Sequence, residues 1–262
     1  MFKAHSQSDQ STRHQLYRPG KDPTVSYERS AAVYDAIYEQ MKDYEQEAGR
    51  VHELAERYKQ SPGNTLLDVA CGTGLHDQYL TKWYDVEGVD LSPAQLAIAR
   101  KRLPKKVKLS KADMTDFDMG KRYDVVTCLF SSIGHLTTLR QMRRGVAEMA
   151  KHLKPGGVLL IEPWITPDQW MPGHVSADLV DRPDLKLARI STTKRKGRIT
   201  KLEMHHVIGR PGQAIQHFVE HHDAALYTVE EYMDALRRAG LTAWHNKQGL
   251  MGRGLFIGRA PK

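Results

Sequence analysis

The stretch that decides the fold is LLDVACGTGLH, residues 66–76. A short apolar run ends in Asp68 and is followed at once by a turn that contains Gly72 and Gly74. A buried strand that runs into a glycine-rich turn and then a helix is the nucleotide-binding corner of α/β proteins, where backbone approaches a ligand closely. The stretch therefore predicts a ligand at this strand end, and the residues around it indicate which ligand.

Outside this turn, short apolar runs alternate with helical stretches as far as Pro163. The strands we predict are TLLDVA, VEGVDL, VKLSKAD, YDVVTCLF and GVLLIEP, with helices up to about Trp83, in SPAQLAIARKRL and in LRQMRRGVAEMAKHL, and with KPGG as a turn before the last strand. Upstream, YEQEAGRVHELAERY places apolar residues three and four apart, which is typical of a helix. Apolar strands separated by helices predict a parallel sheet that is covered on both faces.

The pattern changes after Pro163, where polar and apolar residues alternate up to about Tyr227. This alternation predicts antiparallel strands, which we interpret as a layer inserted over the parallel sheet before the helix TVEEYMDALRRAGL and a final strand GLFIGRA. The predicted fold is an α/β Rossmann-like, mostly parallel sheet with an inserted antiparallel layer. Its parts are a flexible arm (1–26), a core with N-terminal helices (27–163), the insertion (164–227) and a C-terminal helix and strand (228–262).

Composition bounds the class of protein. The chain has 262 residues, is 40% hydrophobic and 27% charged, and contains no apolar run of the roughly 18 residues that a membrane span needs. The polar N-terminus does not resemble a secretory signal, and two cysteines, Cys71 and Cys128, fit core positions in a cytoplasmic protein. The net charge of +8 is partly concentrated in 186–210, which is either a solvated hairpin or a phosphate-facing surface.

Three acids at strand ends identify the ligand. Asp90 lies 22 residues after Asp68, the spacing of a carboxylate that binds ribose hydroxyls, but Asp77 stands where a dinucleotide site would have its third glycine. Asp68 would repel a pyrophosphate and suits a ligand with an ammonium and a sulfonium. At the third strand end, Asp113 can accept from an adenine amine while the backbone of Met114 approaches the ring. The set predicts S-adenosylmethionine (SAM) as cofactor.

The motifs LLDVACGTG, GVDLS, KADM and LKPGG together resemble the class I methyltransferases over 66–163. The resemblance implies a seven-stranded sheet whose last strand is antiparallel. It also implies N-terminal tyrosines over the cofactor carboxylate, a turn that holds the methionyl part, and side chains beside the ribose and adenine. The cofactor residues implied in addition to the three acids are Tyr34, Tyr44, Ala70, Gly72, Gly74, Leu91, Met114 and Phe130.

The methyl acceptor is indicated by the residues after the fourth strand, SSIGH. DNA methyltransferases place [ND]PP[YF] or a Pro-Cys pair there, and neither is present, so a nucleic-acid substrate is not expected. FSSIGHL, EPW, VSAD and GRGLF resemble the nucleotide-sugar N,N-dimethyltransferases, from about Tyr27 onward. This resemblance implies a small-molecule amine on a nucleotide-linked sugar as substrate, and a homodimer that uses the insertion.

The resemblance also places side chains around the acceptor. His135 is expected to take the amine proton or to orient the amine, with a helix cap as the alternative interpretation. Tyr27 matches a tyrosine that closes over the amino sugar, or it anchors a helix. Arg253 is suited to a diphosphate, or it is a surface arginine. Further expected substrate contacts are Ser132, Trp164 and Ser176.

Departures from that family keep other functions open. Ile165 follows Trp164 where a second tryptophan is typical, and GLM precedes GRGLF where Gly-Pro-Ser is typical. Methylation of another small amine or hydroxyl compound, RNA methylation and a non-catalytic SAM-binding protein are the alternatives. The histidines of the insertion alternate sides of their strands without a completing cysteine or acid, so no metal is expected.

Overall fold

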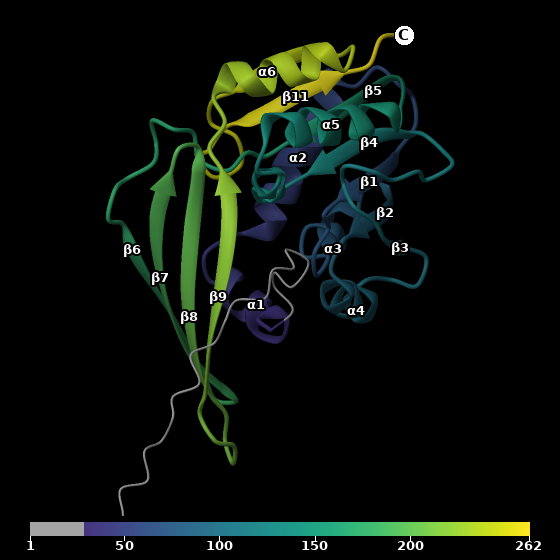
Figure 1. Cartoon of the computed structure of the whole chain (residues 1–262). Helices are drawn as coiled ribbons and strands as arrows, with labels where there is room; N and C mark the ends of the chain where they lie inside the picture. The colour runs from purple at the N-terminus through teal and green to yellow at the C-terminus, as the bar shows by residue number, and fades with distance from the viewer. Residues whose placement is uncertain (1–28) are drawn as a thin grey trace, which may run out of the picture.

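The computed structural model, which describes residues 29–262, has a seven-stranded sheet at its centre. Figure 1 shows its arrangement. Its strand order is β10-β11-β5-β4-β1-β2-β3, and every neighbouring pair is parallel except those that β11 makes with β5 and β10. This confirms the predicted fold class and the antiparallel last strand. The strands are β1 Thr65–Val69, β2 Asp85–Asp90, β3 Lys108–Lys111, β4 Tyr123–Cys128, β5 Leu153–Ile161, β10 Thr242–Asn246 and β11 Leu255–Arg259.

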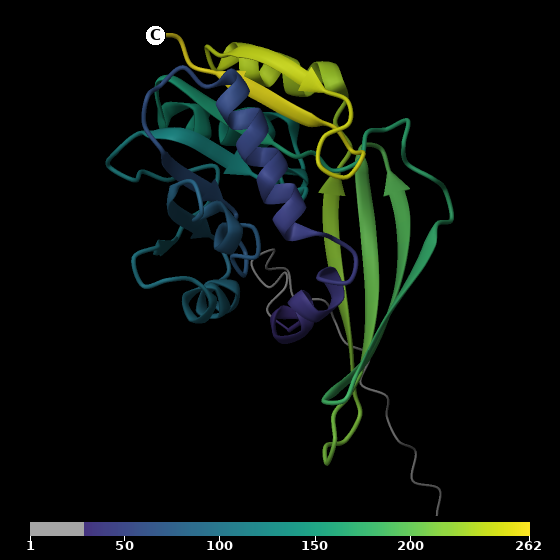
Figure 2. The ribbon, with the colours of Figure 1, turned by 180° about the vertical axis from the view of Figure 1, so that it is seen from behind.

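Helices cover both faces of this sheet, as its continuous apolar strands require (Figures 1 and 2). α5 (Leu139–Lys151) and α6 (Val229–Arg238) pack on one face, and α2 (Tyr44–Tyr58), α3 (Asp77–Leu80) and α4 (Pro93–Arg102) pack on the other. Side-chain caps at Ser92, Thr138 and Thr228 fix where α4, α5 and α6 begin. Cys71 and Cys128 are buried, which confirms their predicted core positions.

A second sheet stands beside the first, at the end toward which the parallel strands point (Figures 1 and 2). It is antiparallel, in the order β6-β7-β8-β9, with bounds β6 Val175–Arg182, β7 Leu185–Lys196, β8 Ile199–Gly209 and β9 Gln216–Ala225. Its inner face packs on α1 (Ala31–Tyr38) through Val33 and Ile37. The expectation that this layer lies over the parallel sheet is wrong, because helices already cover both faces there.

Two local expectations are also wrong, and one strand was missed. KPGG is not a turn but part of β5, where the strand pairing with β4 shifts register and Gly156 takes a φ of +71°. The irregularity is held in place because the carbonyl of Gly156 accepts from the backbone of Gln60 and Ser61. The half-buried strand β10 was not predicted from its residues, and α3 ends at Leu80, before Trp83. No helix among residues 29–262 is long and apolar enough to cross a membrane.

Candidate active site

Asp90 organises the glycine turn at the carboxyl end of β2. One of its carboxylate oxygens accepts from the backbone N–H of Gly72 at 2.8 Å, and the other accepts from the N–H of Ser92 at 2.8 Å. Burial raises the pKa of Asp90, and these backbone hydrogen bonds oppose that effect. The side chain is half-buried at the sheet edge, so it can still accept from ligand hydroxyls, as the ribose interpretation requires.

The turn itself needs left-handed backbone. Gly72 and Gly74 have φ values of +58° and +75°, and Ala70, just before them, also has a positive φ of +62°. A Cβ on Gly74 would come within 2.8 Å of Leu103, so this glycine permits close packing of the turn on α4. A Cβ on Gly72 would meet only Gln95, at 3.7 Å, which leaves space above the turn. Strained non-glycine backbone such as that at Ala70 is typical of functional sites.

Asp68, at the end of β1, shares its buried environment with a second carboxyl. Its Oδ1 accepts from the Thr127 hydroxyl at 2.7 Å, and burial raises its pKa to about 6. The Asp77 side chain is fully buried beside it, and burial together with the Asp68 charge raises the pKa of Asp77 well above its usual range. In its protonated form Asp77 donates to Asp68. The pair thus holds one anion and one neutral acid under the turn.

Asp113 and Met114 follow β3, next to the end of β2. Asp113 is exposed, and its Oδ1 accepts from the backbone and hydroxyl of Thr115, both at 2.8 Å. Its other oxygen has no described partner and can accept from an adenine amine. Met114 packs partly on the core, and Leu91 is 40% exposed beside Asp90 although it is apolar. The structure thus brings these predicted cofactor residues to the same edge of the sheet.

The N-terminal segment is joined to the glycine turn by contacts that the sequence did not indicate. On α1, one Asp35 oxygen accepts from the Thr73 hydroxyl at 2.6 Å, and the other pairs with Arg102 at the end of α4. Tyr34 lies on the same helix, half-buried, with its ring 4.4 Å from that of Tyr38. Asp35 therefore fixes α1 against the turn, and the position of Tyr34 over the cofactor carboxylate stays a prediction.

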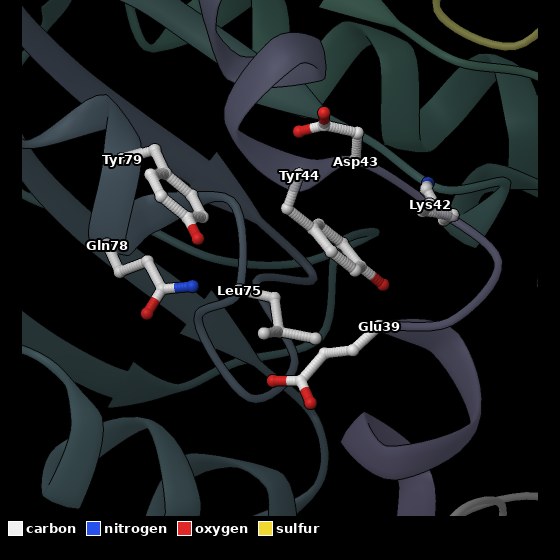
Figure 3. A pocket seen from close by; sticks show the side chains of 7 residues that line it. All are labelled: Glu39, Lys42, Asp43, Tyr44, Leu75, Gln78 and Tyr79. Atoms are coloured by element: carbon white, nitrogen blue, oxygen red, sulfur yellow. The ribbon is translucent and has the colours of Figure 1, made fainter. Parts of the chain in front are cut away.

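Tyr44 lines a pocket of about 380 Å³ beside the turn (Figure 3). The other lining residues are Glu39, Lys42, Asp43, Leu75, Gln78 and Tyr79. The Tyr44 ring is only 5% exposed and meets the His76 ring edge-on, and its hydroxyl has no hydrogen-bond partner among the described residues. A buried, unsatisfied hydroxyl is costly, so this pocket suits a polar ligand atom.

A second strained turn follows β4. Phe130 and Ser131 have φ values of +48° and +67°, and the backbone N–H of Phe130 donates to Glu162 at 2.7 Å. Glu162 directly follows β5 and is fully buried. The Lys42 ammonium lies 3.6 Å from the centre of the Phe130 ring and pairs with Glu47 at 2.9 Å. Desolvation lowers the pKa of Lys42, although the charges of Glu162 and Glu47 oppose it.

Arg253 and Trp164 are brought together at this turn. An Arg253 guanidinium N–H donates to the Ser131 hydroxyl at 2.7 Å, and that hydroxyl donates to the carbonyl of Pro163 at 2.9 Å. The guanidinium lies 5.0 Å from the centre of the Trp164 ring. Trp164 in turn packs on the helix η2 (Ser132–His135), where a Cβ on Gly134 would come within 2.9 Å of it. Two predicted substrate residues thus share one wall.

His135 lies at the end of η2, against β9. Its Nδ1–H donates to the carbonyl of Asp223 at 3.2 Å, which leaves Nε2 as the nitrogen with the lone pair. Surrounding protein lowers the pKa of His135 to about 4, chiefly by desolvation and then by the charge of His222, although the residue is exposed at the surface. The imidazole is therefore neutral at physiological pH. A neutral imidazole with so low a pKa is better suited to orienting an amine than to acting as the general base that takes its proton.

The remaining predicted residues are placed less centrally. Ser132 donates its hydroxyl to the carbonyl of Leu129 at 2.9 Å, within its own turn. Ser176 lies on β6, the strand of the second sheet farthest from β9, and it pairs with Ser191 on the inner-facing side. Tyr27 lies outside the described residues. Within 29–262, no cluster of three or more His, Cys, Asp or Glu side chains has metal-binding geometry.

Several residues of the site were not identified from sequence. Glu162 was visible as a fourth acid at a strand end, the signal that had identified Asp68, Asp90 and Asp113. Asp77 was noted only as a missing glycine. Asp35, Lys42 and Thr127 carried no local signal, because their roles depend on which segments the fold brings together.

These residues fit SAM. The buried carboxyl pair under the turn has no lysine or arginine partner among residues 29–262, so a cationic group of a ligand can pair with it. The Tyr44 hydroxyl has no hydrogen-bond partner among the same residues, so a polar group of a ligand can bind it. Asp90 and Asp113 add acceptors for a ribose and an adenine. The fold and the site define a SAM-dependent methyltransferase.

Comparison with known proteins agrees. A family model described as a methyltransferase domain matches residues 66–157. The chain is 41% identical, over 87% of its length and 96% of the other protein, to a dTDP-3-amino-3,4,6-trideoxy-α-D-glucopyranose N,N-dimethyltransferase from Streptomyces venezuelae. The SAM-bound structure of CalS10, an amino pentose methyltransferase from Micromonospora echinaspora, matches with a TM-score of 0.79 and 39% identity over 87% of this chain and 96% of that chain.

The sugar N-methyltransferase KedS8 from Streptoalloteichus sp. matches with a TM-score of 0.82 and 32% identity, and the match covers 100% of both chains. Similarity at this level spans the second sheet as well as the cofactor-binding core. The chain therefore belongs to the family of SAM-dependent nucleotide-sugar N,N-dimethyltransferases.

Proposed function

We propose that this enzyme transfers methyl groups from SAM to the amino group of a nucleotide-linked deoxysugar, and that it does so twice. The observation that carries the proposal is the position of the Arg253 guanidinium. It contacts Ser131 and Trp164, next to the helix η2 that ends at His135. A guanidinium with donors to spare suits a diphosphate. The relatives named for dTDP-amino sugars support the same substrate class.

The main task of the protein in this reaction is to align the amine lone pair with the methyl group of SAM. SAM supplies a methyl group that is already activated by the sulfonium. The amine lone pair forms the new C–N bond while the C–S bond breaks, and its electrons remain on sulfur; the product ammonium then loses a proton. A neutral His135 can accept a hydrogen bond from the amine and direct its lone pair. Alignment of this kind accounts for a large share of catalysis, on the order of 7–11 kcal/mol.

The test is turnover with a dTDP-linked amino sugar, followed by mass spectrometry. We expect a product heavier by two methyl groups and two molecules of S-adenosylhomocysteine (SAH) per product. Arg253→Ala should raise KM for the nucleotide sugar about 10- to 100-fold with little change in kcat, because one charge-assisted contact contributes about 1.5–3 kcal/mol. Arg259→Ala, at the opposite end of β11, is the matched control. No SAH release with any nucleotide-linked amine would contradict the proposal.

His135→Asn should lower kcat only about three- to tenfold, the effect of one neutral hydrogen bond. Because the pKa of His135 is about 4, its protonation does not shape the rate above pH 5. The acidic limb of the kcat/KM profile should therefore follow the substrate ammonium and keep its midpoint in the variant. A midpoint that moves when His135 is replaced would instead assign the proton transfer to this histidine.

We infer a homodimer as the assembly. The outer face of the second sheet carries exposed apolar side chains in neighbouring strands, with Leu179 70%, Ile190 44% and Val207 42% exposed. Strand register places Leu179 and Val207 in one row across β6, β7 and β8, with Ile190 in the adjacent row. An apolar face of this kind marks an interaction surface. Sedimentation of the chain as a monomer at micromolar concentration would contradict this.

A further inference from the structure

Asp68 and Asp77 place two carboxyl groups side by side under the glycine turn. The methyl-transfer reaction itself does not require this pair. Both side chains are buried, Asp68 at 3% and Asp77 at 0% exposure. Asp68 accepts from Thr127, but both oxygens of Asp77 accept no hydrogen bond from residues 29–262. A carboxylate in that position would be a desolvated and unsatisfied anion, which is strongly unfavourable.

The surroundings explain why the pair keeps one proton. Two like charges side by side do not both ionise in a buried site: the Asp68 charge opposes ionisation of Asp77, whereas the hydrogen bond from protonated Asp77 favours the ionised form of Asp68. The other titratable groups around the pair are Cys71 in the turn, His76 before α3, Asp90 on β2 and Cys128 on β4. Of these groups only His76 is a base, and its Nε2 lies 2.8 Å from the Glu47 carboxylate.

A positive ligand group changes this balance. SAM carries an α-ammonium, and the glycine turn that receives the methionyl part connects Asp68 to Asp77 along the chain. A cation next to two carboxyls favours the state in which both are ionised. We propose that Asp77 is a second, ionisable part of the cofactor's ammonium site, and that binding of the cofactor expels the proton shared by Asp68 and Asp77. This rests on the proposed function only in that SAM is the cofactor.

The sign of the effect follows from linkage. The free pair holds one proton more than the bound pair, so the association constant rises with pH, by up to tenfold per pH unit for a full proton. The rise ends at the pH where the free pair loses the proton by itself. A ligand α-amino group has a pKa of about 7.7–8.0, so the range from pH 6.0 to 7.5 keeps the ligand charged and isolates the protein's contribution.

The experiment is isothermal titration calorimetry of the full chain with SAH, in two buffers of different ionisation enthalpy at each pH. We expect release of about half to one proton per SAH between pH 6.0 and 7.5. 5′-Methylthioadenosine, which lacks the amino-acid part, should release none. Equal release by both ligands, or none by SAH, overturns the inference, whereas SAH binding with normal turnover would leave the proposed function intact.

Variants locate the proton. In Asp77→Asn the side chain cannot ionise, so proton release should disappear and the association constant for SAH should lose its rise with pH. Asp77→Leu, which removes the polar group entirely, should behave in the same way if asparagine disturbs folding. Glu230→Gln, an exposed acid in the first turn of α6, is the matched control and should keep the wild-type release. Unchanged release in both Asp77 variants would overturn the inference.

Discussion

Asp90→Ala is expected to raise the dissociation constant for SAM about 100-fold or more. Asp90 is predicted to accept from ribose hydroxyls, and each hydrogen bond to a charged group contributes about 1.5–3 kcal/mol. Two such bonds correspond to about 3 kcal/mol, or roughly 150-fold in affinity. The substitution also removes the acceptor for the N–H groups of Gly72 and Ser92, which loosens the turn. Calorimetric titration measures the change.

The control for Asp90 lies on the same strand. Asp85 begins β2 at the opposite edge of the sheet and is exposed, so Asp85→Ala should bind SAM as the wild type does. Asp90→Asn keeps the shape and one acceptor, and we expect an intermediate affinity. Wild-type affinity in Asp90→Ala would mean that the ribose lies elsewhere, and the cofactor site assigned to this edge would be wrong.

Glu162→Ala is expected to lower the free energy of unfolding by about 2–4 kcal/mol and to abolish most activity. The substitution leaves the part-buried N–H of Phe130 without its acceptor and removes a buried anion near Lys42. It also releases the left-handed backbone at Phe130 and Ser131, which positions Arg253 and Trp164. For a chain of this length the melting temperature should fall by about 5–10 °C.

Glu162→Gln separates stability from charge. Glutamine can still accept from the N–H of Phe130, so this variant should recover more than half of the lost stability. Its activity should stay below that of the wild type if the charge near Lys42 matters to the site. A melting temperature of Glu162→Ala within 1 °C of the wild type would show that the Phe130 turn does not depend on this carboxylate.

The sequence was most informative where local pattern and chemistry coincide. Strand ends marked by Asp68, Asp90 and Asp113 could be predicted because parallel strands put successive carboxyl ends at one edge. The contacts of Lys42 and Asp35 could not be predicted, since they join segments far apart in the chain, such as Asp35 with Arg102. KPGG was misread because its glycines indicate a turn locally, whereas pairing with β4 extends the strand through them.

α1 has a consequence for any shortened version of the chain. It faces the second sheet through Val33 and Ile37, while Asp35 on its other side meets the Thr73 hydroxyl, and the N–H of Ser30 just before it donates to Glu220 on β9 at 3.0 Å. The eight residues of α1 thus connect the seven-stranded core to the second sheet. Removing residues beyond 29 would delete the contacts of α1 with the glycine turn and with the second sheet together. A truncated chain therefore cannot replace the intact enzyme in measurements of affinity or inhibition.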